Sequence, residues 1–241
     1  MNLDEFKVKF NSIIEMGWIK THRSGNTGIG KTLEDLLDIE ENNIQGPDFD
    51  IYELKASRKS ENAYLTLITQ APSPRGYNSI LRRIGGYPQE KNGKLINCLR
   101  TTLYYEIENE LLNGNKLTYI INTNSQGKKE IRLKLNGKLI DGFWDLESIA
   151  KKMKKKLSNL VYVLADNKYI GNDEYFKFEK AVLLKKDDFT VKSLEEALQE
   201  GLLLIDIRLG QYENGLAHDH GTAIRIKKGN KYKLYNYEEL E

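Results

Sequence analysis

The chain has 241 residues, of which 37 are Lys or Arg and 35 are Asp or Glu, so its formal net charge is only +2. This length suffices for one large domain or two smaller lobes with a real core, but the balanced charge does not indicate a polyanionic partner, so an argument for nucleic acid must rest on local groups. A single cysteine, Cys98, excludes an intramolecular disulfide framework and a cysteine-cluster zinc site, and fits a reducing compartment.

The N-terminal segment shows no sign of a secretion signal or a membrane anchor. Its first residues, MNLDEFKVKF, include acids and contain no apolar run before a small-residue cleavage site. No stretch of the chain approaches the roughly 20 apolar residues of a membrane span. We therefore expect a cytoplasmic protein with no membrane partner.

Hydrophobic spacing predicts helices and strands in the first part of the chain. Apolar residues at helical intervals predict an amphipathic helix over 3–17. Thr32, with Asp35 three residues later, resembles a capping box, so a second helix is expected to begin at Thr32. Runs rich in β-branched and aromatic residues predict two strands that form a hairpin, 49–55 and 64–69.

The remainder of the chain alternates between predicted strands and helices. The segment 72–88 is rich in glycine, proline and arginine and is expected to be a basic loop. Helices are predicted over 145–157 and 193–199, and the Asn136-Gly137 pair predicts a tight turn. Strands are expected at 100–108, 116–122, 129–135, 160–165, 175–184, 202–208, 222–227 and 231–236. The sum is a mixed α/β protein.

One segment matches a phosphate-binding loop. Gly25 to Thr32, GNTGIGKT, fits the pattern G-x-x-x-x-G-K-[ST] at every fixed position, and an apolar run that ends in Asp206 resembles a strand with a magnesium-binding carboxylate. The mechanism needs a buried parallel strand directly before the loop. Residues 18–24 are largely polar instead, so a nucleotide hydrolase that uses Lys31 and Thr32 is kept only as the alternative function.

The segment 46–55, GPDFDIYELK, places acids and a lysine close together. Side chains alternate along a strand, so Glu53 and Lys55 are expected to project from the same face. Asp48 would face the other way on a continuous strand, so a turn or bulge is required before the three side chains can converge. Asp50 has the same parity problem.

These residue types suit the hydrolysis of a phosphodiester. Carboxylates hold a hard cation such as Mg²⁺ through oxygen, and a cationic group orients or deprotonates the attacking water and offsets charge in the transition state. Glu34, beside the apolar stripe of the second helix, is a candidate additional acid. An ordinary charged edge strand is the alternative for the bare pattern, which is weak in isolation.

Several ordered blocks of sequence resemble one enzyme family. The blocks are GNTGIGKT with EDLL within 25–37, PDF at 47–49, ELK at 53–55, PRG at 74–76, DIRLGQY at 206–212 and HDHGTAIR at 218–225. Together and in this order they resemble the MvaI/BcnI restriction endonucleases, which belong to the MutH-like branch of the PD-(D/E)XK nucleases.

The resemblance implies an α/β fold of the PD-(D/E)XK type, with a mixed central sheet flanked by helices and two lobes around a DNA cleft. It implies a monomeric, Mg²⁺-dependent type II restriction endonuclease that cuts double-stranded DNA one strand at a time at a short CC-N-GG-type site. The restriction role in turn implies a cognate DNA methyltransferase in the same system, with no stable complex expected.

Functional residues are carried over position by position. Asp48, Glu53 and Lys55 match the catalytic residues, with the two acids as metal ligands and Glu34 in support. The single endonuclease chain, 1–241, is expected to divide into two lobes. The catalytic lobe would cover 1–90 with core elements from 145–185, and the DNA-recognition lobe 90–145 and 186–241.

The C-terminal blocks contain the candidate base-reading residues. An arginine binds guanine O6 and N7 through two hydrogen bonds in the major groove, which favours Arg208 and Arg225. Asp206 shares a strand face with Arg208 and either orients that arginine or accepts a hydrogen bond from cytosine N4. His218 and His220 are expected to donate to bases or phosphates. As an H-x-H pair they are alternatively ligands of zinc or iron, although no third ligand is evident nearby.

Other basic residues are candidates for contacts with the DNA backbone. Arg75, Arg82 and Arg83 lie in the expected loop, which can follow a phosphate backbone. Lys31 lies in the glycine-rich segment, which is expected to approach a phosphate of a polynucleotide. The five lysines within 145–157 are expected to form a solvated face. A DNA-binding protein that does not cut is the non-enzymatic alternative, and the complete set of acids and lysine argues against it.

Overall fold

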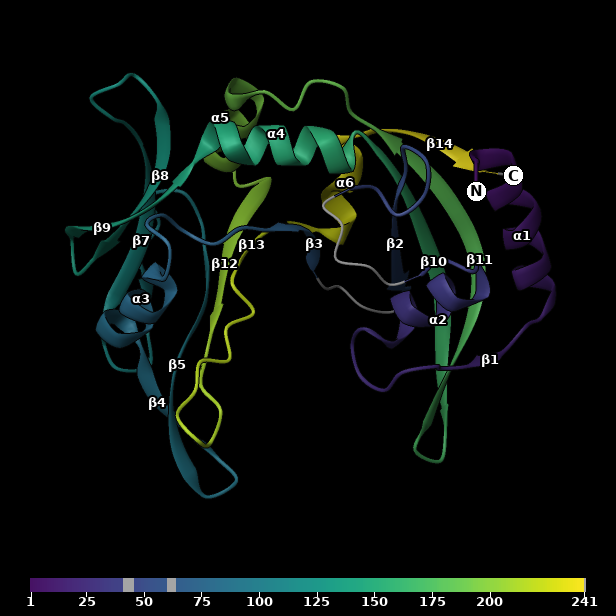
Figure 1. Ribbon diagram of the computed structural model, residues 1–241, viewed down its shortest axis with the longest axis horizontal. Coiled ribbons are helices and arrows are strands. Elements are labelled where there is room, and N and C mark those ends of the chain that lie inside the picture. The colour runs from purple at the N-terminus through teal and green to yellow at the C-terminus, as the bar shows by residue number, and fades with distance from the viewer. Residues whose placement is uncertain (41–45, 60–63, 241) are drawn as a thin grey trace. The chain divides into compact units, whose positions relative to one another are not determined.

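A computed structural model describes residues 1–40, 46–59 and 64–240 (Figure 1). The chain forms two compact units, and each unit is built from separate segments of sequence. Unit 1 comprises Met1–Ala63, Lys154–Asp187 and Tyr232–Glu241, and unit 2 comprises Tyr64–Met153 and Asp188–Lys231.

The described residues contain six α-helices, one short 3₁₀-helix and fourteen strands. The helices are α1 (Leu3–Glu15), α2 (Gly28–Leu36), α3 (Tyr77–Gly85), α4 (Leu146–Leu157), α5 (Val191–Gln199), η1 (Lys228–Asn230) and α6 (Lys231–Leu234). The strands are β1 (Ile19–Lys20), β2 (Glu53–Arg58), β3 (Tyr64–Thr69), β4 (Tyr87–Lys91), β5 (Lys94–Leu103), β6 (Asn109–Glu110), β7 (Lys116–Thr123), β8 (Lys129–Leu135), β9 (Lys138–Asp145), β10 (Asn159–Ile170), β11 (Asp173–Lys185), β12 (Leu203–Leu209), β13 (Thr222–Lys227) and β14 (Asn236–Leu240).

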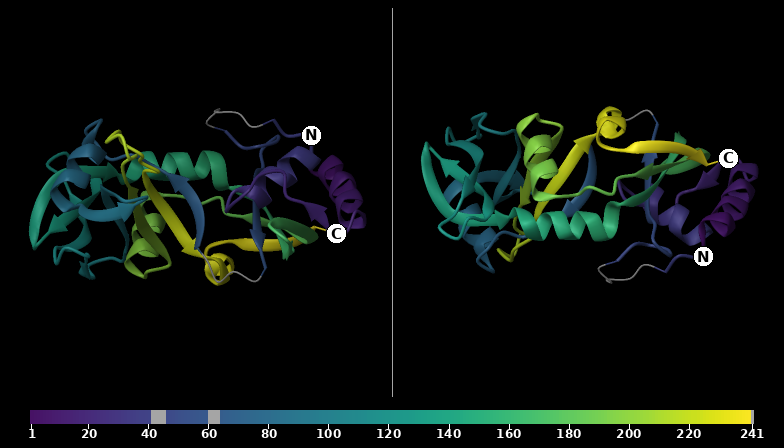
Figure 2. Two further views of the ribbon diagram at one scale, coloured as in Figure 1. Left: turned by 90° about the horizontal axis from the view of Figure 1, so that it is seen from below. Right: turned by 90° about the horizontal axis from the view of Figure 1, so that it is seen from above.

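Unit 1 contains a mixed sheet with the order β1-β11-β10-β2, and β14 also pairs with β11. In Figure 2, β14 is the yellow strand that ends beside the C-terminus. β2 runs parallel to β10, while β10 and β11 form a long antiparallel ribbon. Glu53 lies opposite Leu160 and Lys55 opposite Tyr162. The strand that carries the acid and the lysine is therefore fixed by a partner about a hundred residues later in the chain.

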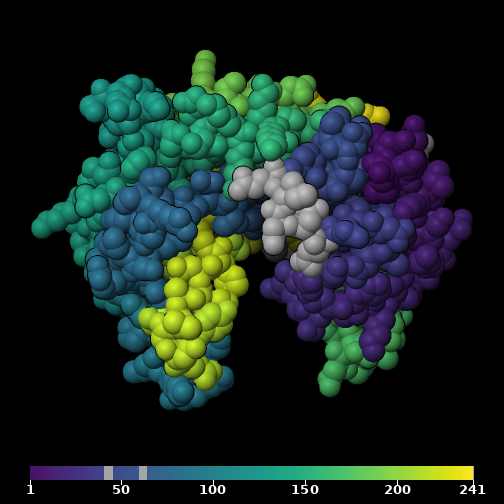
Figure 3. Space-filling view, in the orientation of Figure 1, coloured from purple at the N-terminus to yellow at the C-terminus, as the bar shows by residue number. Residues whose placement is uncertain are grey.

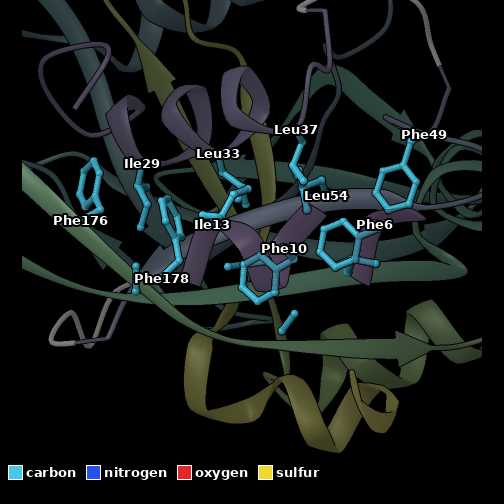
Figure 4. Packing of buried hydrophobic residues seen from close by; sticks show 14 of the residues in the cluster. Phe6, Phe10, Ile13, Ile29, Leu33, Leu37, Phe49, Leu54, Phe176 and Phe178 are labelled. Atoms are coloured by element: carbon cyan, nitrogen blue, oxygen red, sulfur yellow. The ribbon is translucent and has the colours of Figure 1, made fainter. Parts of the chain in front are cut away.

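Helices α1 and α2 cover one face of this sheet. Asn2 and Glu5 form a capping box at the start of α1, which satisfies its first backbone N–H groups. The core of unit 1 contains aromatic and aliphatic side chains from both helices and from three strands: Phe6, Phe10, Ile13, Ile29, Leu33, Leu54, Val161, Val163, Phe176 and Phe178. Figure 4 shows several of them packed together, among them Phe6, Phe10 and Ile13. Because Leu54 enters this core, its neighbours Glu53 and Lys55 face the other way.

A buried ion pair ties the glycine-rich loop to the sheet of unit 1. Arg58 on β2 donates from Nε and Nη2 to the two carboxylate oxygens of Glu174 on β11, at 2.6 and 2.7 Å. Its Nη2 also donates to the carbonyl of Gly25 at 3.2 Å, and Nη1 donates to that of Asn26 at 3.4 Å. The two-point contact fixes the guanidinium plane, and the guanidinium in turn holds the loop that precedes α2.

Unit 2 contains two sheets, with the orders β3-β13-β12-β5-β4 and β6-β7-β8-β9. In the first sheet β12 lies between β13 and β5 and is antiparallel to both. Leu99, Leu103, Tyr119 and Leu133 are fully buried in the core of this unit. The β8–β9 connection is the tight turn predicted at Asn136-Gly137, where both residues have positive φ.

Two predictions about β2 and its surroundings are wrong. The segments 49–55 and 64–69 do not form a hairpin, because β2 pairs with β10 in unit 1 and β3 pairs with β13 in unit 2. Residues Phe49–Tyr52 form a turn before the strand rather than its first half. Strand propensity identifies a segment that can pair, but it does not name the partner.

The predicted start of the second helix is also wrong. Helix α2 begins at Gly28, so Thr32 lies inside it and does not cap it. The Thr32 hydroxyl donates to the carbonyl of Gly28 at 2.8 Å and accepts from the backbone N–H of His22 at 2.9 Å. A threonine that bonds back to position i−4 satisfies its hydroxyl within the helix, and the capping pattern in the sequence was coincidental.

Two further segments differ from the prediction. The expected loop 72–88 contains α3, whose Tyr77 and Leu81 are buried at helical spacing, followed by the start of β4. The expected strand 231–236 is the short helix α6, and β14 begins at Asn236.

The boundaries between the two units lie at 63/64, 153/154, 187/188 and 231/232. β3 and α3 belong to unit 2, while the C-terminal β14 pairs with β11 of unit 1. Within the described part of the chain, none of the helices combines the length and the apolar character that crossing a membrane requires.

The Arg58–Glu174 pair leads to a stability prediction. Glu174→Gln removes the negative charge while Arg58 stays buried, so we expect the free energy of unfolding to fall by about 3 kcal/mol. Urea unfolding followed by circular dichroism measures the change. Glu238→Gln is the matched control, because the Lys185–Glu238 pair is exposed at both ends and should leave the midpoint unchanged. Equal midpoints for the wild type and Glu174→Gln would contradict the assignment.

The same pair predicts a pH dependence. Hydrogen bonds from Arg58 hold the pKa of Glu174 below its usual value. The stabilisation is therefore complete above the unfolded pKa of about 4.3 and is lost as the pH falls through the lower pKa of the folded state. The stability difference between the wild type and Glu174→Gln should be constant near neutral pH and should shrink as the pH falls below the unfolded pKa of about 4.3. A difference that grows in acid would refute this account.

Candidate active site

Glu53 and Lys55 lie on the same face of β2, as their spacing predicts. Lys55 Nζ donates to Glu53 Oε1 at 2.7 Å. β2 is at the edge of the unit 1 sheet, so only one of its sides pairs with a neighbouring strand. The acid and the lysine thus form a contact at a sheet edge, with Lys55 partly exposed and Glu53 buried.

A turn brings Asp48 to the same place. Phe49 and Tyr52 exchange backbone hydrogen bonds of 3.1 and 2.7 Å, and Asp50 at the tip has a positive φ of 46°. The turn lets Asp48 Oδ2 accept from the backbone N–H of Leu54, between Glu53 and Lys55, at 2.7 Å. The sequence analysis required such a turn for convergence. Asp50 is exposed at the tip instead, which favours Asp48 over Asp50 as the second acid.

A second lysine contacts Glu53. Lys156, in the last turn of α4, places Nζ 3.2 Å from Glu53 Oε1. The lysine pattern of this helix predicted a solvated position for Lys156, and that prediction is wrong because Lys156 contacts the buried Glu53. The helical pattern shows which face of α4 is apolar, but it does not show that the last turn ends beside β2. A lone lysine near a buried acid gives no sequence signal.

Burial dominates the electrostatics of Glu53. The residue is only 1% exposed, and burial raises the pKa of its carboxyl group, while Lys55 opposes the rise and Asp48 adds to it. The nearby Tyr235 is buried as well, and burial, followed by the charge of Glu53, raises the pKa of its phenol. Two ammonium groups therefore offset the cost of placing a carboxylate in a low-dielectric site.

Glu34 and Lys31 lie beside Lys55. The three side chains line one open pocket of about 300 Å³, together with the segment that precedes α2 and part of β2: Arg23, Asn26, Thr27, Ile29, Gly30, Leu54 and Ala56. Lys31 also pairs with Asp35 at 2.7 Å. The pocket thus joins the glycine-rich loop, the additional acid and the lysine of β2, three features that the sequence analysis treated separately.

The geometry of the glycine-rich loop differs from that of a nucleotide-binding loop. The strand before it, β1, has two residues and pairs antiparallel with β11, so no buried parallel strand leads into the loop. Carbonyl groups of Gly25 and Asn26 point to Arg58, and the Thr32 hydroxyl is engaged inside α2. These contacts argue against the alternative of a nucleotide hydrolase.

The two acids fit a magnesium ion. Glu53 Oε2 is buried and has no hydrogen-bond partner among the described residues, and Asp48 uses Oδ2 for the Leu54 N–H. The described residues contain no group of three or more His, Cys, Asp or Glu side chains that would form a complete protein cage. Mg²⁺ characteristically takes one or two carboxylates and completes its shell with water and substrate phosphate oxygens, so the residues present suit that ion.

A second polar cluster lies on one face of the first sheet of unit 2. Asp206 on β12 is buried and uses both carboxylate oxygens: Oδ1 accepts from the Thr102 hydroxyl at 2.9 Å, and Oδ2 accepts from Arg225 Nη1 at 2.8 Å. Arg208 Nε lies 3.6 Å from the same Oδ2. Of the two roles considered for Asp206, orienting an arginine matches these contacts.

Arg208 and Arg225 both have hydrogen-bond partners within unit 2, and both side chains are still partly exposed. Arg225 Nη2 donates to the carbonyl of Tyr64, and its guanidinium lies over the Tyr64 ring, 5.4 Å from the centroid. Arg208 Nη2 donates to the carbonyl of His220 at 3.2 Å. Burial lowers the pKa of Arg208, but an arginine in this position stays charged. These contacts fix the orientation of the two guanidinium groups, and each arginine side chain stays partly accessible to solvent.

Strand pairing adds one arginine that the sequence analysis missed. Arg100 on β5 lies opposite Arg208 on β12, so the two share a face of the sheet. Arg100 is exposed. No motif marks it, because its place depends on the pairing of strands that are separated by about a hundred residues.

His218 and His220 lie in the loop between β12 and β13. The His218 ring stacks on Tyr212 with 4.2 Å between centroids, and the His220 ring lies 4.6 Å from that of His218. Burial lowers the pKa of His220, and the adjacent His218, Arg208 and Arg100 lower it further, so the ring is neutral at pH 7. In the part of the chain that the structure describes, no metal-binding cluster includes this pair.

The three arginines of the expected basic loop have different environments. Arg75 is exposed before α3, and Arg83 is exposed on α3. Arg82 is only 7% exposed and donates from Nη1 to the carbonyl of Gly210 at 2.8 Å. The expectation that Arg82 contacts phosphate is therefore wrong, because its guanidinium is committed within unit 2.

Comparisons with known proteins agree with the fold and with the order of the sequence blocks. A sequence model of the MvaI/BcnI restriction endonuclease family matches residues 7–235. Among solved structures, the complex of restriction endonuclease MvaI with its cognate DNA substrate is 30% identical, with a TM-score of 0.84 and coverage of 100% of both chains. MvaI in the absence of DNA is 29% identical, with a TM-score of 0.55 and coverage of 100% of this chain and 99% of that one. No curated protein matches the sequence.

The match over nearly the whole chain confirms the resemblance stated from the sequence, and the mixed sheet of unit 1 with its covering helices confirms the predicted PD-(D/E)XK-type fold. The chain belongs to the MvaI/BcnI restriction endonuclease family.

Proposed function

We propose that the protein is a type II restriction endonuclease that hydrolyses double-stranded DNA at a short CC-N-GG-type site with Mg²⁺, as a monomer that cuts one strand at a time. Family membership supports the nuclease activity. The observation that carries the proposal from this chain itself is the contact of Lys55 with the buried Glu53 beside the carboxylate of Asp48. A cognate DNA methyltransferase would protect the same site without forming a stable complex.

Each residue of the site has a distinct role in the proposed reaction. Glu53 and Asp48 would hold the metal ion, which when bound supplies charge neutralisation at the phosphate and lowers the pKa of water. Lys55 would orient the attacking water or take its proton, and Lys156 would keep Glu53 ionised in its buried position. Glu34, which lines the same pocket as Lys55, would support the lysine.

One basic residue in each unit suits the DNA backbone. Lys31 lines the pocket with Lys55, so we assign it to a phosphate near the scissile bond. Arg75 is exposed and is assigned to a phosphate bound by unit 2. These contacts carry no sequence information and would contribute to binding of any duplex.

Sequence recognition is assigned to the face of β12 and β13. Arg208 and Arg225 would each bind guanine O6 and N7, and Asp206 would fix both forks through its buried carboxylate. His218 and His220, with Tyr212 stacked against them, would contact bases or phosphates beside the arginines. Arg100 joins them as an additional candidate, because it shares their face of the sheet.

The active-site assignment is tested by substitution. Lys55→Ala and Asp48→Asn should each reduce cutting of plasmid DNA in Mg²⁺ by about 10³-fold or more, because each removes a group that acts on the transition state. Binding to duplex DNA in Ca²⁺ should persist. Digestion followed by sequencing of the ends measures both the activity and the site.

Matched controls come from neighbouring positions. Lys59→Ala removes an exposed lysine that pairs with Glu179 just beyond β2, and Asp50→Asn removes the exposed acid at the turn tip. Both variants should cut at the wild-type rate. Full activity of Lys55→Ala would sink the active-site assignment, and loss of activity in Asp50→Asn alone would move the metal ligand from Asp48 to Asp50.

The recognition assignment has its own test. Arg208→Ala or Arg225→Ala should weaken binding to the mapped site by about 10- to 100-fold, which corresponds to 1–3 kcal/mol for a bidentate contact with guanine. Binding to a duplex without the site should weaken much less. Fluorescence anisotropy in Ca²⁺ measures both, with the exposed Lys192→Ala as a charge-matched control. Equal losses on both duplexes would make these arginines backbone contacts.

A further inference from the structure

Arg82 is a buried guanidinium without a role in the proposed chemistry. It lies on α3, where only 7% of the residue is exposed, and its Nε has no hydrogen-bond partner among the described residues. A buried arginine is costly unless its donors are used. Its exposed neighbour Arg83 shows that an arginine on this helix does not have to be buried. We therefore expect the buried Arg82 side chain to have a structural role.

The Arg82 guanidinium is bonded to the first residue of the recognition loop, which we define as residues 210–221 between β12 and β13. Arg82 Nη1 donates to the Gly210 carbonyl at 2.8 Å, and the same carbonyl accepts from the backbone N–H of His218 at 2.9 Å. The Gly210 N–H lies 3.3 Å from Asp219 Oδ1. One peptide group thus joins the buried arginine to the segment that carries both histidines.

A second set of bonds fixes Arg82 itself. Its backbone carbonyl accepts from Asn97 Nδ2 on β5 at 3.2 Å and from the Gly86 N–H at 2.9 Å. The Asn97 N–H donates to Gln211 Oε1 at 3.0 Å, and Gln211 Nε2 donates to the Gly215 carbonyl at 3.1 Å. These hydrogen bonds form a closed network. The Arg82 side chain joins α3 to the recognition loop at Gly210, and Gln211 joins the loop to Asn97 on β5. The Asn97 side chain then bonds to the Arg82 carbonyl.

Gly86 shows how tightly this network is packed. A Cβ atom at Gly86 would lie 2.1 Å from the Arg82 carbonyl oxygen and 2.5 Å from Asn97 Oδ1. Only glycine fits there, so the end of α3 approaches β5 as closely as the backbone permits.

The recognition loop also has contacts at Glu213, which accepts from Asn92 Nδ2 at 2.6 Å, and at His220, whose carbonyl accepts from Arg208 Nη2 at 3.2 Å. Most of its residues are exposed, and the yellow-green surface in Figure 3 shows it in the open. Within it, Gln211 and Ala217 form an isolated bridge, and the His220 N–H bonds back to the Arg208 carbonyl at 2.9 Å. The two histidines therefore lie in a loop whose first residue, Gly210, is bonded to the buried Arg82 side chain.

We propose that Arg82 is a positioning residue for sequence discrimination: it holds Gly210 through a buried hydrogen bond and thereby sets where Arg208, His218 and His220 present their polar groups, without touching DNA. The claim about discrimination rests on the proposed function, whereas the claim about the loop does not. Arg82→Met keeps the length of the side chain but removes the donors. Arg82→Lys keeps the charge and one donor.

Hydrogen exchange tests the claim about the loop without DNA. In Arg82→Met the amides of residues 210–221 should exchange about tenfold faster, as expected for the loss of one buried hydrogen bond, while those of unit 1 should be unchanged. Arg82→Lys should recover part of the protection, and Arg83→Met should match the wild type. Unchanged exchange in Arg82→Met would overturn the proposal. If Arg82→Met fails to fold, Arg82→Lys compared with Arg83→Lys provides the same decision.

Binding tests the claim about discrimination. The probes are two labelled duplexes in Ca²⁺, one with a CC-N-GG sequence and one with it scrambled. The ratio of the two dissociation constants should fall about tenfold in Arg82→Met, with little change on the scrambled duplex, and should stay at the wild-type value in the control Lys192→Ala. Faster exchange with an unchanged ratio would limit Arg82 to a structural role and refute the proposal. A wild type that does not distinguish any duplex would instead refute the proposed function, and hydrogen exchange would still decide the loop.

Discussion

The candidate active site depends on one electrostatic balance, which keeps the Glu53 carboxylate buried at a sheet edge. Removing an ionised carboxylate from water costs several kcal/mol unless it is paired, and here the ammonium groups of Lys55 and Lys156 oppose that cost from two elements far apart in sequence. The turn at 49–52 adds Asp48. Glu53 Oε2 has no hydrogen-bond partner among the described residues, so this oxygen is still able to accept a further positively charged group.

The sequence predicted what depends on local spacing. The alternation of Glu53 and Lys55, the apolar stripes of α1 and α4, and the turn at Asn136-Gly137 are confirmed, because side-chain periodicity and turn chemistry act within a few residues. Ordered blocks extended this to the family and to its fold. The same alternation predicted a turn or bulge between Asp48 and Glu53, and the structure has a turn there.

The sequence did not predict what depends on distant pairing. β2 pairs with β10 although the two strands are about a hundred residues apart in the sequence. The positions of Lys156 and Arg100 also depend on contacts between segments that are distant in the sequence. Local signals also misled in two places: the capping pattern at Thr32 was satisfied inside the helix, and the glycines and arginines around α3 hid its buried Tyr77 and Leu81. In each case tertiary contacts outweighed propensity.

The parallel pairing of β2 with β10 also has a consequence for the nascent chain. When residues 53–58 leave the ribosome, their partner at 159–170 has not been made, and at roughly 5–20 residues per second the delay is about 5–20 s. During that time the whole of 64–153 emerges, and all of it belongs to unit 2. β2 therefore stays without its sheet partner until the whole of 64–153 has been synthesised, so the edge of the unit 1 sheet cannot be completed while that first part of unit 2 is still being made.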